Sequence, residues 1–219
     1  MRMRRLLWGA GLLALMGMGA GCAHDEAKQA RSRGERIGEA FAEKVRYTDQ
    51  LSLLNQEQIA LGHLALMKSS HPEVKAFAQD LIRNHQNSQQ DLLTLAQSKA
   101  MSLAAVDLST QDQAIGGAGA EGVMQGMEQG EEKYDKKFDK QVNQFLEKRN
   151  ELAGLSGRDF DKAFLEQVKE DQERGAELID QGLEKYRDDT ALALLLSRTS
   201  PVIQAHQQRI ATLRGFIGD

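Results

Sequence analysis

The sequence predicts an all-α protein, and three observations support this fold class. Leu, Ala, Gln, Glu and Lys, which are good helix formers, dominate the chain outside one glycine-rich stretch. Only two prolines, Pro72 and Pro201, occur in 219 residues. Large apolar residues recur at intervals of three and four, the repeat of one face of an α-helix. Because the chain has a single cysteine, side-chain packing and not disulfides must hold the fold together.

The first 22 residues have the order of a bacterial export signal. Three arginines precede an apolar run at residues 6–18, which is too short to span a bilayer, and three small residues then lead to Cys22. This layout is typical of lipoprotein signals, in which lipid is attached to the cysteine and cleavage makes it the new N-terminus. We expect residues 1–21 to be a signal peptide and Cys22 to be lipidated. An ordinary cleaved signal and an uncleaved anchor are the alternatives, because Gly19 stands where such signals usually carry an aliphatic residue.

The expected anchor predicts a location in the cell envelope. Stable attachment takes two or more acyl chains, which the mature N-terminus of a bacterial lipoprotein supplies. Ala23, in the second mature position, resembles the arrangement that Gram-negative cells send to the outer membrane. We therefore expect an exported lipoprotein that faces the periplasm, in the outer membrane rather than the inner one.

The charge of the mature chain excludes one class of partner. Three of the 28 basic residues lie in the signal, which leaves 25 lysines and arginines against 32 acidic residues and a formal net charge of −7. A chain this acidic is poorly suited to the phosphate backbone of nucleic acids. We expect a membrane partner through the anchor and no nucleic acid, while the sequence does not indicate a protein partner or small ligand.

The first predicted helical hairpin follows a tether. Residues 22–46 are mostly charged or small and form the predicted lipidated N-terminus and tether, a segment able to become helical. Helices are predicted over residues 47–68 and from Pro72 to about residue 99, and the short connection favours an antiparallel hairpin. The apolar stripes are Leu51, Leu54, Leu61, Leu64 and Ala65 in the first helix and Val74, Phe77, Ala78, Leu81, Ile82, Leu92, Leu95 and Ala96 in the second.

The rest of the predicted bundle follows a glycine-rich segment. Residues 115–130 contain six glycines in sixteen positions, so we predict a flexible insertion over residues 111–130 between two helical hairpins. A charged accessory helix is predicted over residues 131–155, a main helix over 158–186, and a last helix from Asp188 and Asp189, which offer caps, to about residue 216. The predicted architecture is four main helices plus the accessory one, in a domain at residues 47–217.

Polar residues on the apolar stripes give the candidate chemistry. Glu57, His85, Asp171 and His206 each lie three residues after an apolar stripe residue and near the middle of a main helix, and Gln172 shares the stripe of Asp171. Each main helix therefore points at least one polar residue inward.

Two interpretations of these inward residues compete. Carboxylates and imidazoles on facing helices hold metal in ferritin-like di-iron proteins, so Glu57, His85, Asp171 and His206 are the candidate ligands of a divalent metal. Those enzymes use Glu-x-x-His pairs, however, and here isoleucines stand three residues before both histidines. We favour a buried polar network that fixes helix register. One bound metal ion and simple contact with solvent are the alternatives.

Four stretches of the sequence carry a family resemblance. They are Gln56-Glu57 through Leu64-Ala65, HPEVKAFAQDLIRNHQNSQQDLLTLAQSKAMSL from His71, LSGRDFDKAFLEQVKEDQ from Leu155, and Ser200-Pro201 to His206. In this order they resemble the bacterial family known as domain of unknown function 4142, over roughly residues 47–104 and 141–216. The resemblance implies an exported protein with a ferritin-like four-helix bundle, and it implies no particular activity.

The resemblance also bears on the polar residues. Glu57, His85 and His206 match the family pattern. The family usually has Asp where this chain has Asn84, and often His where it has Gln172. These two departures remove a potential ligand and a potential histidine partner.

The functional expectation follows from the anchor and from the motifs. We find no nucleotide-binding glycine motif, His-Glu-x-x-His motif, nucleophile elbow or cysteine nucleophile, so the sequence gives no positive support for an enzyme. We expect a lipid-anchored helical bundle of the cell envelope that acts as a binding or structural module. The alternatives are a metal-binding or redox protein in stress protection, and an interaction protein whose glycine-rich loop and charged 131–152 helix bind a partner.

Overall fold

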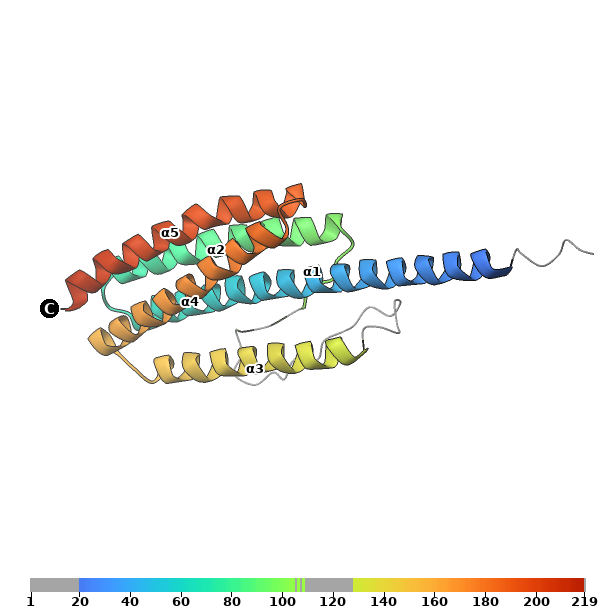
Figure 1. The fold of residues 1–219 in the computed structure, drawn as a ribbon. Helices are drawn as coiled ribbons and strands as arrows, with labels where there is room; N and C mark the ends of the chain where they lie inside the picture. Colours follow the sequence, from blue (N-terminus) through green and yellow to red (C-terminus); the bar gives the residue numbers. More distant parts are fainter. Residues whose placement is uncertain (1–19, 105, 107, 109–127, 219) are drawn as a thin grey trace, which may run out of the picture. The chain divides into compact units, whose positions relative to one another are not determined.

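Five helices make up the structure (Figure 1). The computed structural model describes residues 20–104, 106, 108 and 128–218. Its helices are α1 (Ala20–Lys68), α2 (Pro72–Ser98), α3 (Glu128–Ala153), α4 (Gly157–Lys185) and α5 (Thr190–Gly218). No strand occurs among the described residues. The predicted all-α fold is confirmed, and α2 to α5 begin and end within a few residues of their predicted bounds.

Helix α1 begins before residue 47, where the apolar repeat predicts the first firm helix, and includes the described part of the tether. The chain divides into two compact units, Met1–Ala40 and Phe41–Asp219, and α1 contributes residues to both. The residues before position 47 have few large apolar side chains, so they carry no clear stripe, but they are rich in Ala, Glu, Lys and Arg, which favour helix without packing. In the first unit an exposed ion pair joins Arg31 and Glu35, one turn apart, at 3.2 Å.

Two apolar clusters fill the second unit, and buried polar residues lie between them along the main helices. The first cluster includes Phe77 of α2, Phe164 of α4 and Ile210 of α5, and the second includes Leu92 and Ile179. In α2, α4 and α5 the polar positions 85, 171–172 and 206 separate the residues of one cluster from those of the other. In α1, positions 57 and 58 lie between residues 47 and 51 of the second cluster and residues 61, 64 and 65 of the first, although Leu53, which precedes them, also belongs to the first cluster.

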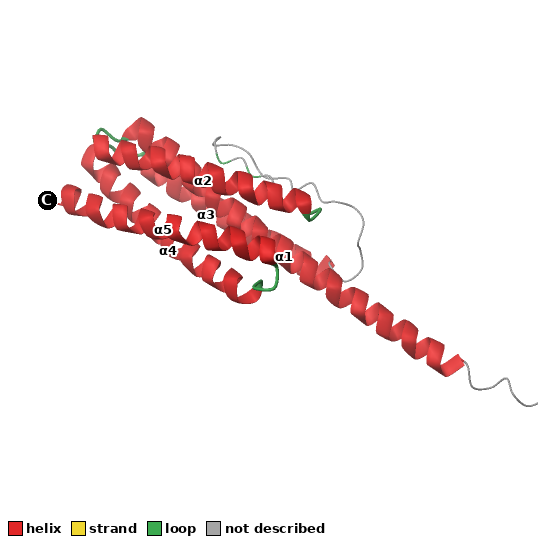
Figure 2. Ribbon diagram, turned by 90° about the horizontal axis from the view of Figure 1, so that it is seen from above, coloured by secondary structure: helices red, strands yellow, loops and turns green. Residues whose placement is uncertain are grey.

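The order of the clusters gives the directions of the helices. Helices α2 and α4 both run from the first cluster to the second, while α1 and α5 run from the second to the first. The connection from α2 to α4 must therefore return along the bundle, and α3 lies in this connection. Helix α3 packs on the first cluster through Phe138, Val142 and Phe145. Figure 1 shows the four main helices as one group with α3 beside them, and in the view from above in Figure 2 the main helices overlap α3.

Local sequence explains where three of the helices begin. Pro72 occupies the first turn of α2, where its missing N–H costs no hydrogen bond. Gly157 begins α4 with a φ of 56°, a left-handed conformation that glycine adopts without strain. Asp189 caps α5, as predicted, because its Oδ1 accepts the Leu192 N–H at 3.3 Å.

Some predictions fall outside the described residues. The predicted signal peptide lies there except for its last two residues, and the predicted glycine-rich insertion lies there except for residues 128–130, which belong to α3. Within the part of the chain that is described, no helix is long and apolar enough to cross a membrane. The lipidation of Cys22 stays a prediction.

Candidate functional site

The four candidate residues come from the four main helices and lie in the core. Glu57 of α1, His85 of α2, Asp171 of α4 and His206 of α5 are each at most 3% exposed, so the prediction that they point inward is confirmed. Helical spacing places each one on the face that the apolar stripe buries. We call the buried polar residues at this level the polar belt, which consists of Asn55, Glu57, Gln58, His85, Asp171, Gln172 and His206.

Asp171 sets the direction of the hydrogen bonds in the polar belt. An ionised carboxylate can only accept, and Asp171 accepts from Gln58 Nε2 at 2.8 Å and from Gln167 Nε2 at 3.1 Å. Arg174 pairs with its Oδ1 at 3.1 Å. Because Gln58 donates through its nitrogen, its Oε1 is left to accept, and it accepts from Gln172 Nε2 at 3.0 Å. The hydrogen bonds therefore run from α4 to α1 and back to α4.

Gln172 then connects both histidines and fixes their tautomers. Its Nε2 lies 3.2 Å from His85 Nε2, and its Oε1 lies 3.2 Å from His206 Nδ1. Since an amide nitrogen donates and an amide oxygen accepts, His85 Nε2 accepts and His206 Nδ1 carries the hydrogen. His85 Nδ1 donates to Asn55 Oδ1 at 2.9 Å, and His206 Nε2 accepts from Asn84 Nδ2 at 3.0 Å. Both imidazoles are neutral, with their hydrogen on Nδ1.

The electrostatics of the core favours the same neutral state. Burial, together with the nearby His206, lowers the pKa of His85 to about 3. Burial also lowers the pKa of His206 to about 4, although Asp80 opposes the shift. The two ring centroids are 5.4 Å apart, so a proton on one ring would disfavour a proton on the other. The pair is therefore uncharged at neutral pH.

The hydrogen bonds continue beyond Asn55 and tie α1 to α2. Asn55 Nδ2 donates to Gln89 Oε1 at 3.4 Å, and Gln89 Nε2 donates to Ser52 Oγ at 2.9 Å. Each partner occupies a particular turn of its helix, so a shift of one helix by a turn would leave buried amides or imidazoles without partners. Because an unpaired buried polar group is costly, these bonds favour one register of the four main helices.

Glu57 lies at the edge of the polar belt, and Arg174 connects it to Asp171. Arg174, whose side chain is half exposed, forms ion pairs with both Glu57 and Asp171. Burial raises the pKa of Glu57 to about 8, although Arg174 opposes the shift, and Asp171 adds to it. Burial likewise raises the pKa of Asp171, against Arg174 and the amides of Gln58 and Gln167.

The structure thus divides the four candidate ligands into two pairs. Glu57 and Asp171 meet through Arg174, and His85 and His206 meet through Gln172. Across the described ranges, no group of three or more His, Cys, Asp or Glu side chains is arranged to hold a metal ion. The role of the four residues as metal ligands stays a prediction.

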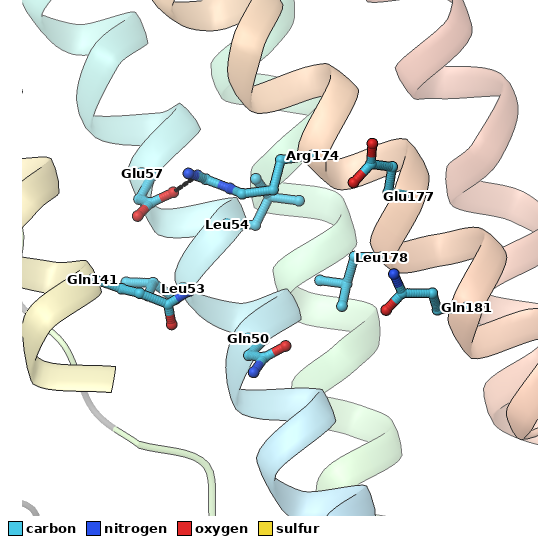
Figure 3. Close-up of a pocket in the computed structure, with 9 residues that line it drawn as sticks. All are labelled: Gln50, Leu53, Leu54, Glu57, Gln141, Arg174, Glu177, Leu178 and Gln181. Carbon is cyan, nitrogen blue, oxygen red and sulfur yellow. Dashed lines mark hydrogen bonds and ion pairs between the residues drawn. The ribbon is translucent and has the colours of Figure 1, made fainter. Parts of the chain in front are cut away.

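A cavity of about 180 Å³ lies beside Glu57, between α1, α3 and α4 (Figure 3). We call it the Glu57 cavity. Figure 3 shows the ion pair of Glu57 and Arg174 at one end and the amide of Gln50 at the other. The complete lining is Gln50, Leu53, Leu54 and Glu57 from α1, Gln141 from α3, and Arg174, Glu177, Leu178 and Gln181 from α4.

The sequence-based prediction did not single out two members of the polar belt, Asn55 and Gln58, or Arg174, which pairs with the buried carboxylates. Gln58 and Asn55 lie four residues after Leu54 and Leu51, so the stripe that singles out Glu57 also contained a signal for both. Arg174 carried no such signal, because its side chain is 53% exposed and only its guanidinium reaches the buried carboxylates.

Comparison with protein families identifies the family to which the chain is similar. The sequence profile of the family described as "Domain of unknown function (DUF4142)" matches residues 38–213. No curated protein and no solved structure matches the chain.

Proposed function

The chain belongs to the DUF4142 family, whose description gives no activity, and we propose that it acts in the cell envelope as a lipid-anchored helical bundle without catalysis, a binding or structural module. The order of residues 1–22 supports export and an anchor at Cys22, facing the periplasm from the outer membrane. The absence of a catalytic motif from the sequence supports a role in binding or structure.

One observation in particular carries the structural part of this proposal. Both ring nitrogens of His85 and of His206 already have hydrogen-bond partners inside the protein. All four contacts are to side-chain amides, those of Asn55, Asn84 and Gln172. A ring nitrogen that accepts a hydrogen bond must give up that bond before its lone pair can coordinate a metal. The polar belt therefore serves as an internal network that sets the arrangement of the helices.

Metal analysis of the purified protein tests this role. We expect less than stoichiometric iron, manganese, zinc or copper and an unchanged Tm when these ions are added, because the imidazole nitrogens are occupied. A rise in Tm with one equivalent of any of these ions would contradict the proposal, since a ligand that binds only the folded state must stabilise it. Robust turnover of a substrate by the purified protein would contradict the non-catalytic role.

Cell fractionation tests the anchor. We expect the full chain in the outer-membrane fraction and a Cys22→Ser variant in the soluble periplasmic fraction or retained with an uncleaved signal. A matched substitution at the neighbouring residue, Ala23→Ser, keeps the cysteine and should leave the protein with the membrane. If Cys22→Ser fractionates and matures like the parent chain, lipidation at this position is wrong.

A metal-binding or redox protein is the second candidate function, and the closeness of the two histidines favours it. Their rings lie 5.4 Å apart and are neutral, and neutral imidazole is the form that ligates metal. Movement of the Gln172 and Asn84 amides would free the Nε2 lone pairs of His85 and His206, respectively. This candidate predicts a stoichiometric divalent ion that is lost in His85→Ala and retained in a variant of the exposed His63, His63→Ala.

A further inference from the structure

The Glu57 cavity combines a buried acid with an apolar wall. Glu57 is 3% exposed, and its Oε2 accepts from Arg174. Leu53, Leu54 and Leu178 supply apolar surface along the same cavity. Figure 3 shows these leucines between the ion pair at one end and the amide of Gln50 at the other. A ligand that fits this lining needs a polar head and a short hydrocarbon body.

The acidic side chains around the cavity outnumber the basic ones. The guanidinium of Arg174 pairs with two carboxylates that are both more than nine-tenths buried, those of Glu57 and Asp171. One positive charge therefore faces two acids. Glu177, on the same cavity, adds a third acid, and the remaining polar lining residues are the uncharged Gln50, Gln141 and Gln181.

We propose that the Glu57 cavity binds a small aliphatic amine in its ammonium form, with the ammonium at Glu57 and the hydrocarbon chain against Leu53, Leu54 and Leu178. An ammonium supplies the second positive charge that Glu57 and Asp171 need when both are ionised, and it donates charge-assisted hydrogen bonds to a carboxylate. An anionic ligand would need Arg174, whose guanidinium already serves two acids, and it would meet Glu177. This inference deepens the proposed binding role by giving the class of ligand.

The protonation of Glu57 fits the same ligand. Burial raises the pKa of Glu57 to about 8, with Arg174 opposing and Asp171 adding to the shift, so a proton neutralises this acid at neutral pH when the cavity holds no cation. The other charged group that lines the cavity is Glu177 of α4, while α3 contributes the uncharged Gln141. An ammonium that takes the place of this proton would release it to solvent. Amine binding at pH 7 should therefore be accompanied by proton release.

Titration calorimetry of the purified full chain in a non-ionic detergent, with butylamine as the probe, tests the proposal. We expect saturable binding of butylamine, with an affinity of roughly millimolar for so small a ligand, and no binding of butanol or butyrate. Runs in two buffers of different ionisation heat measure the released proton. Preferential binding of butyrate, or absence of butylamine binding at saturating concentrations, would overturn the proposal.

Variants locate the binding in the cavity. Glu57→Gln keeps the size of the side chain and should weaken butylamine binding by about tenfold or more, because a hydrogen bond to a charged group is lost. The matched control is Glu73→Gln, which removes an exposed acid paired with Arg209 on α5 and should leave binding unchanged. Equal binding by the parent chain and Glu57→Gln would overturn the assignment to this cavity.

A second pair of variants avoids the buried acid and therefore any loss of folding. Gln181 is exposed on α4 at the lining of the cavity. Gln181→Lys should weaken and Gln181→Glu should strengthen butylamine binding, each by about two- to fivefold, the size expected of a solvent-exposed charge. Identical affinities for the two variants would contradict a cationic ligand. None of these outcomes bears on the anchor or on the hydrogen bonds of His85 and His206, which fractionation and metal analysis test separately.

Discussion

Replacement of His206 by glutamine removes one buried imidazole while keeping its hydrogen-bonding chemistry. Glutamine offers one donor for Gln172 Oε1 and one acceptor for Asn84 Nδ2, the two contacts that His206 makes. The variant should therefore fold. The difference that we expect is in how the free energy of unfolding depends on pH, because glutamine does not titrate.

The pKa of His206 gives the magnitude. Burial lowers it from 6.5 to about 4 in the folded protein, so between these values the unfolded chain binds more protons than the folded one. The stabilising contribution is complete above about pH 6.5 and is lost as the pH falls towards 4. Between pH 7 and pH 5 the parent chain should lose about 2 kcal/mol more stability than His206→Gln.

Urea unfolding at pH 7, 6 and 5 measures this difference, because pH effects shared by the parent and the variant cancel in the comparison. The control is His63→Gln, which removes a histidine from the surface of α1 and leaves the buried contacts of His206 in place. If the pH profile of His206→Gln is parallel to that of the parent chain, His206 has the same pKa in the folded and the unfolded protein. The neutral, hydrogen-bonded imidazole would then be wrong.

Three further predictions concern packing and charge. Gly182→Ala should destabilise the bundle by about 1–3 kcal/mol, because the added Cβ would overlap the Tyr47 hydroxyl. Gly215→Ala should stabilise it by about 0.5–1 kcal/mol, because the added Cβ would meet no other atom and alanine favours helix. Thermal unfolding measures both changes. Asp189→Asn should destabilise the protein by about 1 kcal/mol at pH 7 and by little at pH 2. Hydrogen bonds from Lys44 and Lys99 overcome the effect of burial and lower the pKa of Asp189 from 3.8 to about 2, so the stability that this carboxylate contributes is lost as the pH falls through this range. Urea unfolding at both pH values checks this prediction. Glu57→Gln should gain stability relative to the parent as the pH rises from 5 to 8. The folded parent holds the Glu57 proton more tightly than the unfolded chain, and it loses the resulting stability as that proton dissociates. A difference in unfolding free energy that does not change with pH would contradict this prediction.

The sequence was sufficient to predict the helices and the inward residues, because both depend on the apolar repeat. Phe77, Phe164 and Ile210 lie in the core, and the stripes on which they lie carry His85, Asp171 and His206 inward with them. The early start of α1 was not predictable in this way, since residues 20–46 form helix largely without a packed stripe.

The contacts within the polar belt were beyond a prediction of this kind. Whether His85 meets Gln172 or Asp171 depends on the rotation of each helix by a fraction of a turn, and helical spacing along one chain segment does not fix that rotation. Arg174 is the clearest case, because an exposed residue on a charged helix face reaches into the core only by the length of its side chain. The pairing of Glu57 with Arg174 therefore required the structure.

The most direct test of the central claim, that the core histidines are neutral members of an internal hydrogen-bond network, is the nitrogen NMR spectrum of their imidazole rings at pH 7, with and without added divalent metal. For both His85 and His206 we predict a protonated, pyrrole-type Nδ1 and an unprotonated, pyridine-type Nε2, unchanged by the metal. A charged ring, a hydrogen on Nε2, or a metal-induced shift of either Nε2 would contradict the account.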